Sequence, residues 1–121
     1  MRFQQQLNTV ILVGRAGHHP DIKYFESGRT KASFSLAVDR PRTSPKEEAQ
    51  TDWFRIELWG RQAEVAYEYV KKGSLVGIRG KLAFQNNDEG KLEYFILSHG
   101  LRLIGSKHDI VAPKIQDDLP F

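Results

Sequence analysis

The sequence predicts an all-β fold, a small barrel of short strands into which a single helix is inserted. Glycines and prolines divide the chain at the spacing typical of strands, alternating hydrophobicity recurs in several of the resulting segments, and helical periodicity is clear in one of them. The chain has 121 residues with 40% hydrophobic content, which suffices for one domain with a core of its own.

The N-terminal third predicts three strands. Residues 7–13 (LNTVILV) are apolar and β-branched, and residues 21–25 form a second short segment. Gly28 lies in the turn that follows, where glycine can take a positive φ. Residues 30–39 alternate cleanly, which predicts a half-buried strand with one apolar face, made of Ala32, Phe34, Leu36 and Val38.

Residues 52–60 (DWFRIELWG) predict a further strand, reached through a long, polar, proline-containing loop over residues 40–51. Alternation separates its two faces: Phe54, Ile56 and Leu58 lie on one, and Trp53, Arg55, Glu57 and Trp59 on the other. A core does not accept unpaired charges, so the face that carries both tryptophans is expected to lie outside the core.

Residues 61–72 change to helical spacing and end in two lysines before Gly73, which predicts a helix of about three turns. Residues 74–84 and 92–104 return to strand patterns, the last one bent at Gly100. This order is that of a five-stranded Greek-key barrel of the OB type, with the helix between the third and fourth main strands. Strands and loops of such barrels bind oligonucleotides or oligosaccharides.

The net charge of +3 hides an asymmetry. Residues 105–121 hold two basic and three acidic residues, and the rest of the chain holds 16 basic and 12 acidic ones, a net charge of +4. A basic body favours a polyanionic partner, although many proteins of this charge bind nothing acidic.

Several function classes are excluded by composition and spacing. The chain has no cysteine, and its four histidines lack metal-ligand spacing, so we expect neither a metal nor another cofactor. Residues 14–17 (GRAG) are not followed by the Gly-Lys-Ser/Thr of a phosphate loop, and no nucleophile with a base is evident, so the protein is not expected to be an enzyme. Without a signal peptide or an apolar run of membrane-spanning length, we expect a cytoplasmic location.

The tryptophan face has two interpretations. The rings cap the rim of the barrel or lie in a subunit interface, or they are stacking platforms for unpaired bases with cations around them. In the second interpretation the phosphate contacts come from the neighbouring basic residues, namely Arg55, Arg61, Lys72, Arg79 and Lys81. The last five residues, Asp117, Asp118, Leu119, Pro120 and Phe121, are either a solvated end or a peptide ligand for an apolar pocket with a basic rim.

The chain resembles the bacterial-type single-stranded DNA-binding proteins (SSB family). The resemblance covers nearly all of residues 1–105 and is densest in a few segments, namely 8–14 (NTVILVG), 21–24 (DIKY), 51–55 (TDWFR), 58–66 (LWGRQAEVA) and 69–74 (YVKKGS). Residues 117–121 (DDLPF) are similar to the acidic tip of the family, which typically ends Asp-Asp-Ile-Pro-Phe.

The resemblance implies a homotetramer that wraps single-stranded DNA without strong sequence preference in replication, recombination and repair. It divides the chain into a DNA-binding domain (1–105), a short flexible linker (106–116) and an acidic tip (117–121) that docks onto replication and repair enzymes. It assigns base stacking to Trp53 and Trp59 and basic contacts to Arg55, Arg61 and Lys72. Two customary stacking aromatics are replaced, one by Arg42 or a neighbour and one by about Asn87.

Which aromatics replace these two is left open, and three further aromatics, Phe54, Tyr94 and Phe95, are given no stacking role. The alternatives left open are an OB protein of the primosomal PriB kind, which lacks the acidic tip, and an OB domain that binds structured RNA.

Overall fold

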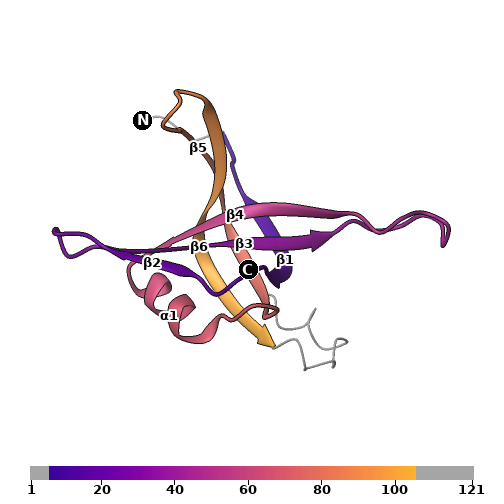
Figure 1. Ribbon diagram of the computed structural model, residues 1–121, viewed down its shortest axis with the longest axis horizontal. Coiled ribbons are helices and arrows are strands. Elements are labelled where there is room, and N and C mark those ends of the chain that lie inside the picture. The colour runs from indigo at the N-terminus through magenta and orange to yellow at the C-terminus, as the bar shows by residue number, and fades with distance from the viewer. Residues whose placement is uncertain (1–5, 106–121) are drawn as a thin grey trace.

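The computed structural model describes residues 6–105, which form a β-barrel with one helix (Figure 1). The elements in chain order are β1 (Val10–Ala16), β2 (Asp21–Tyr24), β3 (Thr30–Asp39), β4 (Thr51–Trp59), α1 (Arg61–Tyr69), β5 (Leu75–Asn86) and β6 (Leu92–Gly105). The linker and acidic tip expected over residues 106–121 lie outside the described residues.

Five strands close the barrel in the order β1-β5-β6-β4-β3, because β1 also pairs with β3. The long strand β3 makes this closure possible. Its first residues, Thr30 to Ser33, pair with β2, and its later residues Leu36 and Ala37 pair with β1. All pairings are antiparallel except that of β4 with β6. The predicted all-β class, with one helix between β4 and β5, is confirmed.

The core is filled by the alternating apolar positions of the strands. Of the face predicted for β3, Ala32, Phe34 and Leu36 are fully buried and Val38 packs against the core from its edge. Further buried side chains come from β4, α1, β5 and β6, including Ile56, Leu58, Ala63, Ala66, Val76, Ile78 and Ile96. Burial of these apolar surfaces is the main term that stabilises the barrel.

The helix is shorter than predicted and has no basic last turn. It ends at Tyr69, and Val70 takes an extended backbone with φ −83° and ψ 127°. Val70 is fully buried, and Gly73, with φ 89°, donates its N–H to the carbonyl of Ala16 at 2.8 Å. These tertiary contacts redirect the chain into β5, so the two lysines that precede Gly73 lie in a turn and not in the helix.

The expected bend in the last strand is a β-bulge. Arg79 pairs with Gly100, whereas the next residue of β5, Gly80, pairs with Ser98, so His99 is the extra residue. A Cβ at Gly80 would collide with the carbonyl of Leu97, so this close approach of β5 and β6 requires glycine.

Three hairpin connections project from the barrel in different directions (Figure 1): the β2–β3 turn, the β3–β4 loop and the β5–β6 hairpin. The β3–β4 loop, residues 40–50, is exposed along almost its whole length, as predicted. Within the described part of the chain, no helix is long and apolar enough to cross a membrane.

Candidate nucleic-acid interface

The outward side of β4 carries Trp53, Arg55, Glu57 and Trp59, which together are called the β4 outer face below. Trp53 is 56% exposed, Arg55 is exposed and Trp59 is half-buried, whereas Glu57 is buried. At a rise of about 3.4 Å per residue, the two tryptophan Cα atoms lie about 20 Å apart along the strand. The predicted separation of the two faces of β4 is therefore observed, except that the outer face contains a buried carboxylate.

Trp53 lies against a glycine at the end of β1. A Cβ added to Gly17 would come within 2.7 Å of Cζ3 of Trp53, so the ring lies directly over this backbone. Gly17 is held there because its N–H donates to the carbonyl of Ser35 at 2.7 Å. Across the strand pair, Trp53 faces the small Ala37. One side of the Trp53 ring is thus covered by the Gly17 backbone, and the other side is exposed to solvent.

Trp59 belongs to a cluster of aromatic rings and cations at the other end of β4. Its ring stacks on Phe25, with centroids 5.5 Å apart and an interplanar angle of 21°. The guanidinium carbon of Arg29 lies 4.1 Å from the centroid of Trp59, and Nζ of Lys31 lies 5.8 Å from it. Lys23 adds a further cation, 5.0 Å from the centroid of Phe25. Such cation–π contacts are favourable and place positive charge beside a stacking surface.

Sequence reasoning missed Phe25 and Arg29. They flank the β2–β3 turn, in which the N–H of Phe25 donates to the carbonyl of Arg29 at 2.9 Å and Gly28 takes φ 91°. The aromatic residue at the end of the predicted segment 21–25 was the available signal. Its proximity to Trp59 follows only from the register of β2, β3 and β4.

Two of the predicted basic residues flank the β4 outer face. Arg61 begins the helix and lines a shallow pocket with Arg29 and Trp59, and its Nη1 lies 3.8 Å from the carboxylate of Glu64. Lys81 lies on the same side of the sheet as the β4 outer face, because Lys81 pairs with Leu97 and Leu97 pairs with Glu57. With strands about 4.8 Å apart, the Lys81 backbone is about 10 Å from that of Glu57.

Two more of the predicted basic residues, Arg79 and Lys72, lie farther from the strand. Arg79 is exposed on β5, opposite Gly100 at the bulge. Lys72 is exposed in the turn before Gly73, whose carbonyl accepts a hydrogen bond from Nη1 of Arg15 at 2.9 Å. Arg15 pairs with Ala37, which in turn pairs with Trp53. Arg15 is thus a cation near Trp53 that the sequence reasoning did not select.

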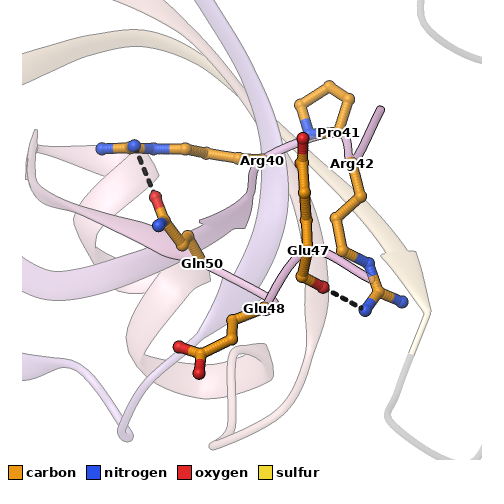
Figure 2. Close-up of a pocket in the computed structure, with 6 residues that line it drawn as sticks. All are labelled: Arg40, Pro41, Arg42, Glu47, Glu48 and Gln50. Carbon is orange, nitrogen blue, oxygen red and sulfur yellow. Dashed lines mark hydrogen bonds between the residues drawn. The ribbon is translucent and has the colours of Figure 1, made fainter. Parts of the chain in front are cut away.

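Arg42 is engaged within the β3–β4 loop and is not among the residues of the β4 outer face. Its Nη1 donates to the carbonyl of Glu47 at 3.2 Å (Figure 2). The Glu47 carboxylate accepts hydrogen bonds from the hydroxyl and the backbone N–H of Thr43, which lower the pKa of Glu47.

The base of the same loop is closed by an ion pair. Arg40 donates to both carboxylate oxygens of Asp52 at 2.9–3.1 Å and to Oε1 of Gln50 at 2.6 Å. The Arg40 hydrogen bonds lower the pKa of Asp52, and the same pair raises the pKa of Arg40. Figure 2 shows the Arg40 and Arg42 side chains directed to different partners in the loop.

The two positions without the customary aromatics are occupied by polar side chains with local roles. Arg42 binds within its loop, and Asn87 closes the β5–β6 hairpin, where its Oδ1 accepts from the N–H groups of Glu89 and Lys91 at 2.9 Å. The previously unassigned Phe54 packs against the core, and Phe95 is half-buried, whereas Tyr94 is exposed beside Phe84 on the hairpin. None of the three joins the β4 outer face.

Comparisons with known proteins show the family to which the chain belongs. Residues 7–96 match the model of the single-strand binding protein family. The chain belongs to this family. Single-stranded DNA-binding protein 1 of Synechocystis sp. is 49% identical over 108 residues, which cover 85% of this chain and 88% of that protein. The single-stranded DNA-binding protein of Thermosynechococcus vestitus is 43% identical, over 85% of this chain and 87% of that protein. That of Halalkalibacterium halodurans is 39% identical, over 70% of this chain and 52% of that protein.

Membership of the single-strand binding protein family confirms the predicted resemblance and the non-enzymatic class. Within residues 6–105 no group of three or more histidines or carboxylates is placed to hold a metal ion. The tip residues Asp117, Asp118, Leu119, Pro120 and Phe121 lie outside the described residues, so their role stays a prediction.

Proposed function

We propose that this chain binds single-stranded DNA, without strong sequence preference, along the β4 outer face. The observation that supports this most directly is that Trp53 and Trp59 lie on one outward face of a strand, about 20 Å apart, with cations at both ends and between them. The relatives named above bind single-stranded DNA according to their names. The predicted contacts are Trp53, Trp59, Arg55, Arg61, Lys72, Arg79, Lys81 and Arg42, to which Phe25, Arg29, Lys31 and Arg15 are added.

The chemistry of the face suits unpaired bases. Each base offers a π-surface whatever its identity, and stacking on an aromatic side chain contributes about 1–3 kcal/mol per base, as found for proteins of this kind. Bases in a duplex are already stacked on each other and do not reach the rings. The cations bind phosphates, which are common to all sequences, so both contributions are independent of sequence.

The assembly we propose is a homotetramer. Support comes from large apolar side chains left exposed on the β5–β6 hairpin, namely Phe84, Leu92 and Tyr94, of which Phe84 and Tyr94 pair across the two strands. Contiguous exposed apolar side chains of this size mark protein interfaces. The β4 outer face lies on another strand, so assembly through the tip of the hairpin leaves it accessible to DNA.

The cellular role that we propose is the protection of single-stranded DNA during replication, recombination and repair in the cytoplasm. In this proposal, residues 117–121 recruit the partner enzymes. The support is the similarity of these residues to the acidic tip of the family, together with the net charge of −1 of residues 105–121.

Titration of the full chain with oligo-dT, followed by tryptophan fluorescence and with light scattering for mass, tests the proposal. We expect quenching that saturates, comparable affinity for other unstructured DNA sequences, and much weaker binding of duplex DNA. The same titration with a hairpin RNA tests the alternative that the chain binds structured RNA. Absence of quenching by oligo-dT, or preference for structured RNA, would overturn the proposed function, and a monomeric mass would overturn the assembly.

A further inference from the structure

A carboxylate is buried in the middle of the β4 outer face. Glu57 is 4% exposed, and its Oε2 has no hydrogen-bond partner among the described residues. Two cations approach this oxygen, Nη2 of Arg55 at 3.6 Å and Nζ of Lys31 at 4.0 Å. A buried charge without hydrogen bonds destabilises a fold, and a carboxylate on this face also repels phosphates. Its presence at this position therefore needs an explanation.

The two cations reach Glu57 from opposite sides. Arg55 lies toward Trp53 along β4, with 49% of its side chain exposed. Lys31 pairs with Trp59 across the β3–β4 ladder, and 24% of its side chain is exposed. Glu57 itself faces Ser33 on β3, a side chain short enough to leave room for both cations. One carboxylate thus holds one cation beside each tryptophan.

We propose that Glu57 acts as an internal counter-anion for Arg55 and Lys31. It is a positioning residue: it holds both cations on the β4 outer face and reduces the charge that they offer to phosphates. This inference rests on the proposed binding of single-stranded DNA. The ionic part of such binding comes from counterions released when cations meet phosphates. A cation already paired with a carboxylate neutralises less phosphate charge, so fewer of the counterions condensed on the DNA are released. Glu57 therefore shifts the balance of binding from ionic contacts toward stacking.

The change Glu57→Gln removes the charge and keeps the shape. The slope of log K against log salt is about −0.7 per phosphate contact for single strands. Glu57 carries one negative charge, so its removal raises the net charge of the site by one and makes the slope steeper by about 0.7. We therefore expect tighter binding of oligo-dT at low salt. The ratio of variant to wild-type affinity should grow about 2.6-fold when salt falls from about 200 mM to about 50 mM.

Two comparisons separate this role from a merely structural one. Glu68→Gln removes the same charge from an exposed position on α1 and should leave the slope close to that of the wild type. In a background that carries Lys31→Gln and Arg55→Gln, the change at Glu57 should no longer steepen the slope, because the cations through which it acts are absent.

Circular dichroism and thermal unfolding check that each variant folds. Should Glu57→Gln fold poorly, Glu57→Met takes its place, since an apolar side chain of similar volume often replaces a buried ion without loss of stability. An unchanged or shallower slope in a folded variant, or an equal effect of Glu68→Gln, overturns the inference. Failure of the wild type to bind oligo-dT would overturn the proposed function as well, so the two failures are distinguishable.

Discussion

The indole of Trp53 lies over Gly17, so that a Cβ on this glycine would come within 2.7 Å of Cζ3 of the ring. A hydrogen bond of 2.7 Å from Gly17 to Ser35 fixes the glycine in the barrel. The orientation of Trp53, which is exposed on its other side, thus depends on the absence of a side chain at a residue 36 positions earlier in the sequence.

Gly17→Ala is expected to tilt the Trp53 ring and to weaken binding of oligo-dT. The loss should not exceed that of Trp53→Ala, because stacking on one ring contributes about 1–3 kcal/mol in total, or about 5- to 160-fold in affinity. Gly100→Ala is the matched control, since a Cβ there meets nothing closer than 3.9 Å. Fluorescence titration measures both variants, and equal affinity of the two would contradict the support role of Gly17.

The two tryptophans should act independently. Each of Trp53→Ala and Trp59→Ala is expected to weaken binding of oligo-dT by about 1–3 kcal/mol with little dependence on base sequence. At a separation of about 20 Å they share no neighbour, so the double variant should show the sum within about 0.5 kcal/mol. Isothermal titration with a strand long enough to reach both rings measures this. A single variant with unchanged affinity and an intact circular dichroism spectrum would remove that ring from the site.

Phe25 is expected to support Trp59 through its stacked ring. Phe25→Leu keeps an apolar side chain but loses the ring pair, an interaction of about 0.5–1.5 kcal/mol. We expect weaker DNA binding than in the wild type, with a smaller loss than for Trp59→Ala. Tyr69→Leu, which removes an exposed ring at the end of α1, is the control. If Phe25→Leu binds as well as Tyr69→Leu does, Phe25 does not belong to the site.

Local patterns predicted the strands and their faces, because alternation reflects which side of a strand is buried. The apolar faces of β3 and β4 were predicted residue by residue for this reason, and both tryptophans were placed on one outward face. The predicted end of the helix was wrong. Burial of Val70 and the hydrogen bond from Gly73 to Ala16 are tertiary interactions, and they outweigh the local preference for a longer helix.

The parts of the site that the sequence did not predict depend on strand register. Phe25 and Arg29 meet Trp59 only because β3 pairs with both β2 and β4. The burial of Glu57 has the same origin, since Lys31 reaches it from β3 and Leu97 pairs with it from β6. No spacing within a single segment carries this information.

The ion pair between Arg40 and Asp52 predicts a pH effect at the base of the β3–β4 loop. Hydrogen bonds from Arg40 lower the pKa of Asp52 from its ordinary 3.8. The pair therefore stabilises the folded loop above that value, and the contribution is lost as the pH falls through the lowered pKa. In Arg40→Gln the pKa of Asp52 should rise toward 3.8, as measured by NMR titration of the carboxyl carbon.

Glu47 provides an internal control in the same titration. Its pKa is lowered by the hydrogen bonds from Thr43, so it should stay below its ordinary 4.5 in Arg40→Gln. A pKa of Asp52 that does not move in this variant would show that Arg40 is not its partner in solution.

Removal of residues 117–121 should separate the two proposed activities. The body keeps its net positive charge and its tryptophans, so binding of oligo-dT is expected to be equal or stronger, because two carboxylates that repel phosphates are removed. Pull-down of repair helicases or primase should be lost. Phe121→Ala in the full chain is the finer variant, since it keeps both aspartates and removes only the ring expected to enter an apolar pocket. Weaker DNA binding after the truncation, or partner capture that persists without these residues, would contradict the division of the chain into a DNA-binding body and a recruiting tip.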